Sequence, residues 1–326
     1  MMLYKFMRDK VSYNKITDNQ YLGTYNDTGY SNIEHFILNY IDDSTNIISS
    51  KDTNILQKYI TDYYRLLEAY YNANKLLINN DKTVLLVSCT NDMRKNADNI
   101  QFYSGKYLIK QSSSIKILGY ILTNNLSHDK YINYIISKAN NRLYTINLMG
   151  KYLSMRNRIL LTTSLIISII RYSLVIMTDI NSKQIKILNV LIHKLARSSL
   201  GYHSYRWSNI KVLEKCKWMN APHLIIYASL CLIHKVNTEG IPKSILNMFV
   251  YNDKVNSRLT RTPCRLVHSP KYSKLEHTTL YRGLLYYNKV GEDIKTLPLK
   301  QFKTQVKMFI KQKMPLDRFN TYRDYI

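Results

Sequence analysis

The chain has 326 residues, 45% of them hydrophobic, so it is long enough to bury a sizeable core in one large domain or two smaller ones. Lysine and arginine number 47 against 22 aspartates and glutamates. The resulting formal charge of +25 points to a polyanionic partner, most often nucleic acid and less often an anionic membrane surface. The four cysteines are far apart and form no C-x-x-C pair, which argues against a disulfide framework and favours an intracellular chain, in the nucleus or the cytoplasm.

One stretch among the first 49 residues has a clear pattern. Residues 1–30 are polar, and no continuous apolar run of a signal peptide follows the basic start "MMLYKFMRDK". From 33 to 49, the β-type runs "HFILNY" and "STNIIS" flank the adjacent Asp42 and Asp43. This pattern predicts a β-hairpin that carries two carboxylates at its turn.

A helix and several strands are expected next. Apolar and tyrosine side chains recur at helical spacing over 55–70, with Asp52 as the N-cap and residues 72–74 as the exit. The runs "TVLLVSC", "FYSGKYLIK" and "IKILGYIL" read as strands. The Ser-Gly pair at 104–105 predicts a hairpin turn.

After residue 126 the patterns are helical. Residues 128–149 and 154–177 predict a helical hairpin that is hinged at Gly150. The apolar part of the second segment is long enough to cross a bilayer, but Arg171 is costly there, so we predict a buried helix and no membrane partner. The remaining expected elements are helices at 181–199, 208–218, 222–237 and 242–249, a linker at 256–282 and a final helix from Leu299.

The Tyr-x-Asp-Asp sequence at the predicted turn has a chemical logic. A tight turn holds Asp42 and Asp43 at a sheet edge, and carboxylate oxygens suit Mg²⁺ or Mn²⁺. Two such ions can clamp the attacking 3′-hydroxyl and the leaving pyrophosphate of a nucleotide. Adjacent aspartates are also common in ordinary surface turns, so these residues alone leave both interpretations open.

The order of the motifs favours metal ligands over an ordinary surface turn. The Tyr40 to Asp43 turn is followed by a helix that ends in "NKLLINNDKT", and then by the strand sequence "IKILGYIL". Together with the ending "LLYYNKVGEDIKTLPLKQFKTQVKMFI", this succession resembles non-LTR (LINE-type) retrotransposon reverse transcriptases over about residues 33 to 312. The resemblance implies that Asp42 and Asp43 are catalytic metal ligands, with Asp42 the direct one. It also implies that Tyr40 contacts the primer end or the nucleotide.

The same resemblance implies roles for residues in two further motifs. Lys82 would neutralise or protonate the departing pyrophosphate, although an exposed lysine at a strand entry explains it as well. Leu118 and Gly119 would lie in the primer grip, where glycine allows a close approach of the backbone to nucleic acid. A buried strand with one small residue is the plainer alternative.

The chain departs from the family upstream of the hairpin. Only 41 residues precede Asp42, whereas family members carry upstream a first palm motif with another metal-binding aspartate and a glycine-rich nucleotide-pocket motif. Asp9, Asp18 and Asp27 lie in polar sequence rather than in a hydrophobic strand. We therefore expect an incomplete polymerase, with the third carboxylate supplied by one of these residues or by another chain.

Cations surround the predicted helical hairpin, which corresponds to the thumb of the family. The candidates for phosphate contacts are Lys138, Arg142, Lys151, Arg156 and Arg158. A solvated helix face accounts equally for about a third of them. The segments 203–207 and 258–275 mix arginine with aromatic residues, which suits single-stranded nucleic acid.

No zinc site is expected. Cys216, His223, Cys231 and His234 fall within predicted amphipathic helices, whereas structural zinc ligands usually come in pairs from tight knuckles. A buried cysteine and a hydrogen-bonded histidine are the better interpretation.

The expected fold is α+β, a partial polymerase palm (β-hairpin, helix and short strands) followed by a mainly α-helical thumb and C-terminal region. The expected divisions are a polar N-terminal segment at 1–30, a partial reverse transcriptase palm at 31–125, a helical thumb-like region at 126–255, and a basic linker with the C-terminal helix at 256–326. The expected function is an RNA-directed DNA polymerase, with an RNA template, a DNA primer and an upstream polymerase half as partners. The alternatives are a non-catalytic, basic nucleic-acid-binding remnant and a decayed fragment without a selected role.

Overall fold

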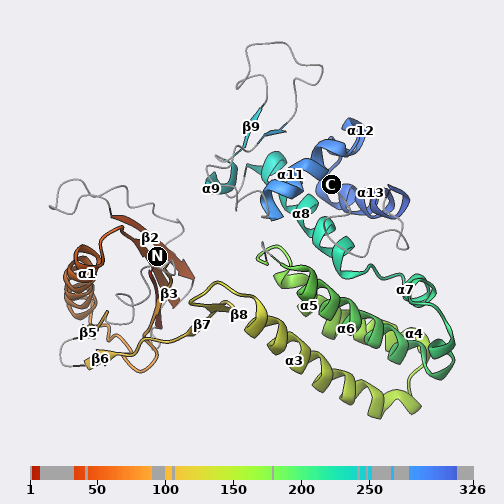
Figure 1. Ribbon diagram of the computed structural model, residues 1–326, viewed down its shortest axis with the longest axis horizontal. Coiled ribbons are helices and arrows are strands. Elements are labelled where there is room, and N and C mark those ends of the chain that lie inside the picture. The colour runs from red at the N-terminus through yellow and green to blue at the C-terminus, as the bar shows by residue number, and fades with distance from the viewer. Residues whose placement is uncertain are drawn as a thin grey trace. The chain divides into compact units, whose positions relative to one another are not determined.

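The computed structural model of the chain describes residues 2–7, 33–40, 43–89, 100–104, 107–177, 180–240, 243–246, 249–251, 266–267 and 279–313. These residues form a mixed α+β structure, which confirms the α+β part of the predicted fold (Figure 1). The chain divides into two compact units, Met1–Tyr131 and Ile132–Ile326. The division falls shortly after the boundary that we predicted near residue 125.

A four-stranded antiparallel sheet in the order β2-β3-β1-β4 is the frame of the first unit. β2 (Glu34–Tyr40) and β3 (Asp43–Ser49) form the predicted hairpin, and β4 (Val84–Val87) is a predicted strand. β1 (Met2–Met7) lies in the segment 1–30, for which we had predicted only a polar N-terminal segment. It pairs with β3 on one side and β4 on the other, and no local pattern reveals such long-range partners.

Helix α1 (Thr53–Ala73) lies on one face of this sheet. The carboxylate of Asp52 accepts hydrogen bonds from the amides of Asn54 at 2.7 Å and Ile55 at 3.3 Å, which confirms the predicted N-cap. A hairpin of β5 (Phe102–Ser104) and β6 (Tyr107–Ile109) also packs here, while its predicted turn at residue 105 lies outside the described residues. The shared core comprises Ile33, Ile48, Leu56, Tyr59, Ile60, Tyr64, Leu85, Val87, Ile100, Phe102 and Ile109.

A buried polar network fastens the β2–β3 hairpin to α1. Nδ1 of His35 lies 3.0 Å from the Tyr59 hydroxyl, and Nε2 lies 3.1 Å from Oδ1 of Asn46. The same Oδ1 accepts a hydrogen bond from Tyr63 at 2.9 Å. Because an amide oxygen only accepts, Nε2 carries the proton and Nδ1 accepts from Tyr59. Burial lowers the pKa of His35, and the hydrogen bond to Asn46 opposes this shift.

A second hairpin, β7 (Ser114–Ile117) and β8 (Tyr120–Thr123), covers the opposite face of the sheet. The apolar side chains that pack there are Ile47, Val84, Leu86, Ile115, Ile117 and Leu122. The sequence "IKILGYIL" is therefore not the single strand that we expected. Leu118 and Gly119 form a two-residue turn with φ values of +46° and +88°. Positive φ at both central residues matches the right-handed twist of the flanking strands.

The predicted helical hairpin begins at the end of the first unit and lies mostly in the second. Helix α3 (Asp129–Leu148) ends in the short η2 (Met149–Lys151), which contains Gly150. A continuous helix follows, composed of α4 (Met155–Thr162), the π-helical η3 (Thr163–Ile167) and α5 (Ser168–Ser173).

The apolar run at 159–177 is amphipathic in the fold. Ile166, Ile170 and Leu174 are buried, while Ser168 and Arg171 are exposed. This arrangement agrees with the predicted packed helix. Among the residues that the structure describes, no helix combines the length and the apolar character needed to cross a membrane.

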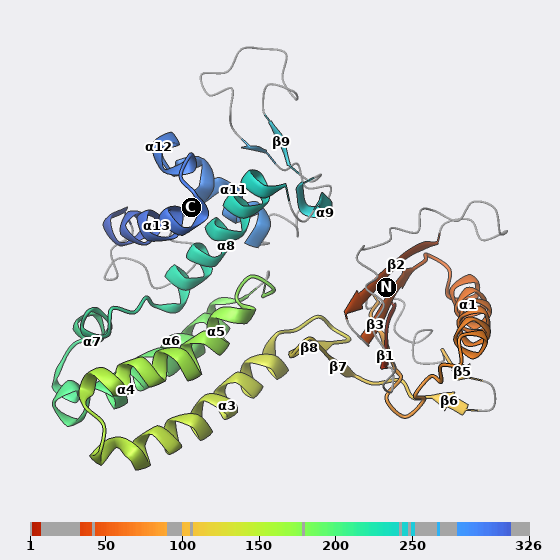
Figure 2. The ribbon, with the colours of Figure 1, turned by 180° about the vertical axis from the view of Figure 1, so that it is seen from behind.

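Further helices surround α8, which is buried over most of its length and packs against α6, α11 and α13 (Figure 2). The remaining elements are α6 (Ser182–Leu200), η4 (Tyr202–Arg206), α7 (Asn209–Cys216), α8 (Ala221–Glu239), α9 (Lys243–Leu246), β9 (Val250–Tyr251), β10 (Leu266–Val267), α11 (Thr279–Lys289), α12 (Glu292–Lys295) and α13 (Leu299–Lys313). Helices α6 to α9 and α13 agree with the prediction. Helix α11 begins inside the stretch that we expected to be a linker.

Helices α8 and α11 approach closely at Gly283. A Cβ atom at this position would lie 2.6 Å from Cδ1 of Ile233 and 3.0 Å from Cβ of Ser229. The absence of a side chain at Gly283 therefore sets the distance between the two helices.

Candidate functional site

A cavity of about 230 Å³ lies at the end of the β2–β3 hairpin. Its lining residues are Leu38, Asn39, Tyr40, Asp43, Thr45, Ile117 and Leu118. Tyr40 and Asp43 are cross-strand partners, the last pair of the hairpin before its turn. The cavity thus brings Tyr40, Asp43 and Leu118 together, although the sequence placed them in two separate motifs. Asp42, the other predicted ligand, lies outside the described residues.

The pleat of β3 explains why Asp43 faces this cavity. Side chains alternate between the two faces of a strand. Asn46 and Ile48 contact α1, whereas Asp43 and Thr45 point to the side covered by β7 and β8. Thr45 has no motif of its own, so only its register on β3 could have identified it as a lining residue.

The Leu118–Gly119 turn presents its leucine to the cavity. Leu118 is 48% exposed and adopts a left-handed conformation that is unfavourable for a leucine. A Cβ atom at Gly119 would meet nothing within 4 Å, so the glycine is required by its φ of +88° rather than by lack of space. The close approach of nucleic acid that we predicted at Gly119 stays a prediction, because these distances concern only the protein's own atoms.

Lys82 lies in the turn before β4, where its amide donates to the carbonyl of Asn79 at 3.2 Å. The register places Val84 opposite Lys5, and Lys5 opposite Thr45. The turn that holds Lys82 is therefore at the same end of the sheet as the carboxylate hairpin. Lys82 is not among the described residues that line the cavity.

The donor atoms around the cavity suit a hard cation. The described side chains on the cavity face of the hairpin offer oxygen atoms from Asp43, Thr45 and Tyr40, and oxygen ligands favour Mg²⁺ or Mn²⁺ over softer metals. Within the described part of the chain, no group of three or more His, Cys, Asp or Glu side chains could hold a metal ion. Asp42 and the three upstream aspartates are outside that part.

The five cations of the predicted thumb have unlike surroundings. The guanidinium of Arg142 donates to the carbonyl of Leu165, so this side chain contacts the neighbouring helical segment. Arg158 on α4 is half-buried, and its guanidinium lies beside Gly201. Nζ of Lys138 lies 3.3 Å from the Tyr134 hydroxyl and 5.4 Å from the centre of its ring.

The other two cations, Lys151 and Arg156, are exposed at the turn between α3 and α4. Tyr152, between them, is 89% exposed. This turn therefore combines positive charge with an accessible aromatic ring, a combination that proteins use to bind single-stranded nucleic acid.

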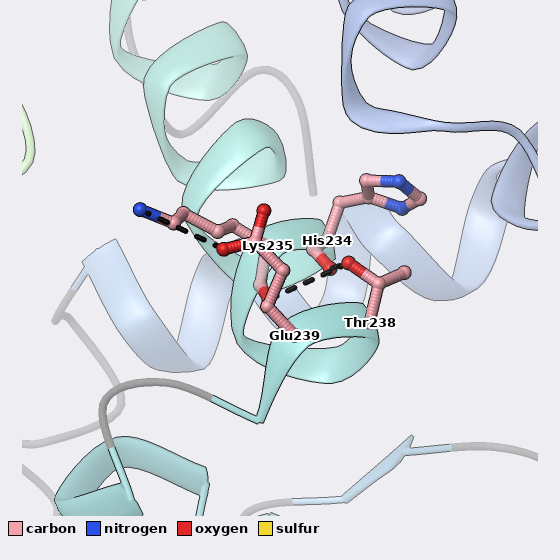
Figure 3. Close-up of polar contacts among 4 residues, drawn as sticks. All are labelled: His234, Lys235, Thr238 and Glu239. Carbon is pink, nitrogen blue, oxygen red and sulfur yellow. Dashed lines mark hydrogen bonds and ion pairs between the residues drawn. The ribbon is translucent and has the colours of Figure 1, made fainter.

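His234 is a packed core histidine, as we predicted. Its Nε2 lies 2.9 Å from the carbonyl oxygen of Leu297, and its ring stacks on Phe302 with centroids 3.7 Å apart. Figure 3 shows the ring pointing away from the ion pair between Lys235 and Glu239 on the same helix. Burial lowers the pKa of His234, while the Leu297 carbonyl and Glu239 oppose this shift.

No protein-family model matches the chain, and neither a curated protein nor a solved structure was found to be similar to it.

Proposed function

We propose that the chain is a reverse transcriptase-related protein of the RNA-directed DNA polymerase class, of the non-LTR type that its motifs resemble. The cavity at the hairpin end carries this proposal, because it joins Tyr40 and Asp43 with Leu118 across more than 70 residues of sequence. A palm-like arrangement for the first unit is part of the proposal. It is supported by a carboxylate hairpin beside a central strand, with α1 on one sheet face and the cavity on the other.

Each residue has a defined task in this proposal. Asp42 and Asp43 would hold Mg²⁺ or Mn²⁺. When bound, the ion would stabilise the negative charge that develops on the phosphate oxygens during phosphoryl transfer. Tyr40 contacts the primer end or the nucleotide, and Leu118 holds the primer strand at the cavity. In the reaction, the primer 3′-hydroxyl loses its proton to solvent water, its oxygen forms a bond to the α-phosphorus, and the bond from that phosphorus to pyrophosphate breaks. Lys82 neutralises or protonates the departing pyrophosphate.

Primer extension on an RNA template tests this proposal. The chain is compared with Asp42→Ala and Asp43→Asn in the presence of Mg²⁺ and then Mn²⁺. Asp62→Asn on α1 is the matched control, because it removes a carboxylate from a helix that packs on the sheet face opposite the cavity in the same unit. We expect extension by the wild type and the control but not by the two hairpin variants. Extension by Asp42→Ala at the wild-type rate would refute the catalytic assignment.

A second candidate function is nucleic-acid binding without catalysis. The exposed Lys151, Tyr152 and Arg156 at the α3–α4 turn favour it, because binding by such a turn needs no metal site. Under this proposal the chain binds primer–template in a salt-sensitive manner, and Asp42→Ala leaves the affinity unchanged. Binding without extension would select this function over the first.

A further inference from the structure

Two cations from distant parts of the sequence meet at one tyrosine ring. The Tyr227 ring on α8 has Cζ of Arg171 at 5.6 Å and Nζ of Lys307 at 5.5 Å from its centre. Arg171 belongs to α5 and Lys307 to α13, so three helices contribute to the cluster. Tyr227 itself is only 7% exposed. The buried ring thus holds two exposed cationic groups at one place on the surface of the second unit.

The sequence of α13 extends this cluster into a row. Phe302, Val306 and Ile310 are the buried residues of α13, which packs against α8. Lys303, Lys307 and Lys311 each follow one of them directly and are exposed. A spacing of four residues puts the three lysines on one side of the helix, beside the apolar contact. Packing α13 on α8 therefore also fixes where the lysine row lies.

Among the described residues of its three helices, the cluster has no carboxylate of its own. Helices α5 and α13 contain no Asp or Glu, and the acid in α8, Glu239, pairs with Lys235 at 3.8 Å (Figure 3). Burial lowers the pKa of Lys307, and the nearby Arg171, Lys311 and Lys303 lower it further, while Cys231 opposes the shift. Like charges that are held together in this way are stabilised by an anion.

We propose that Arg171, Lys303 and Lys307 form a phosphate-binding site that holds the backbone of a single-stranded nucleic acid. The identity of the ligand as nucleic acid rests on the proposed function, whereas the site itself rests on the cation cluster. A guanidinium can bind two phosphate oxygens at once, and the two ammonium groups add point charges. Because the Tyr227 ring is buried, it offers no surface on which a base can stack. The site therefore binds without reading sequence.

Salt-dependent binding of a short, labelled single-stranded RNA tests the site. The full chain is compared with the triple variant Arg171→Gln/Lys303→Gln/Lys307→Gln by fluorescence anisotropy. The matched control, Lys183→Gln/Lys186→Gln/Lys215→Gln, removes the same charge from exposed positions on α6 and α7. We expect the slope of log affinity against log salt to fall by roughly 1 to 2 in the triple variant, because each neutralised phosphate of a single strand contributes about 0.7 to the slope. The control changes the slope by less.

Equal slopes of log affinity against log salt for the triple variant and the control would refute the proposed phosphate-binding site. A circular dichroism melt of each variant shows whether it is folded, and the exposed positions of all six side chains make unchanged melting temperatures the expected result. The triple variant is also compared with its parent on the Asp43→Asn background, where the same fall in slope separates the site from the proposed polymerase function. A second arm uses tripolyphosphate alone. Binding of tripolyphosphate through the three cations, without binding of RNA, would overturn the nucleic-acid assignment.

Discussion

Asp43 on β3 is the Cα partner of Met7 on β1, at the last position of the pairing between the two central strands. The sequence alone left Asp9, Asp18 and Asp27 as equal candidates for a third carboxylate. Asp9 is the one that follows Met7 by only two positions, although it lies outside the described residues. This short separation in the sequence makes Asp9 the first of the three residues to test as the acid that completes the proposed metal site.

We predict that Asp9→Asn abolishes metal-dependent primer extension, while Asp18→Asn and Asp27→Asn retain it. Loss of a metal ligand removes oxygen coordination that an amide replaces poorly. The measurement is primer extension over a titration of Mg²⁺. Full activity of Asp9→Asn would assign the third carboxylate to another residue or another chain.

Substitution of Leu118 in the turn with Gly119 is expected to stabilise the first unit but to weaken primer binding. Asparagine tolerates a left-handed conformation better than leucine, so Leu118→Asn should raise the free energy of unfolding of the first unit by about 1 kcal/mol. The same change removes the leucine from the cavity and should weaken primer binding. Gly119→Ala should lower the free energy of unfolding by about 1 kcal/mol, since only its φ of +88° is disturbed. Urea denaturation checks both values, and a destabilised Leu118→Asn would contradict the proposed strain.

The His35 network predicts how stability depends on pH. The pKa of His35 is lowered in the folded state, so below its ordinary value of 6.5 the unfolded chain binds more protons than the folded chain. The contribution of His35 is therefore complete above that pH and is lost as the pH falls. We expect urea denaturation between about pH 5 and about pH 7.5 to show a stability that increases with pH. His35→Gln should reduce this dependence, and an unchanged dependence in the variant would exclude His35 as its source.

A larger side chain at Gly283 is expected to cause a packing defect in the second unit. Gly283→Val would force side-chain carbons against Ile233 and Ser229, and overpacking of this kind costs about 1–3 kcal/mol. The free energy of unfolding measured with urea should fall by that amount. Lys289→Val provides a control on the same helix, because it introduces the same β-branched residue at an exposed position. Similar losses in both variants would show that helix propensity, not the α8–α11 contact, is responsible.

Local patterns were enough to identify several elements. The helical period and the Asp52 cap predicted α1, and the alternation around Asp42 and Asp43 predicted the β2–β3 hairpin. The helical hairpin around Gly150 was predicted in the same way. These features depend on residues within a few positions of one another, so their chemistry is visible in the sequence.

The sequence by itself therefore determined the α+β class, most element positions and the formal charge of +25. Only the tertiary structure decided that β1 lies between β3 and β4, that Tyr40, Asp43 and Leu118 line one cavity, and that Arg171 and Lys307 meet at Tyr227. Each of these relations joins segments that are far apart in the chain. They are set by strand pairing and by the burial of apolar faces, which depend on the whole fold rather than on local spacing.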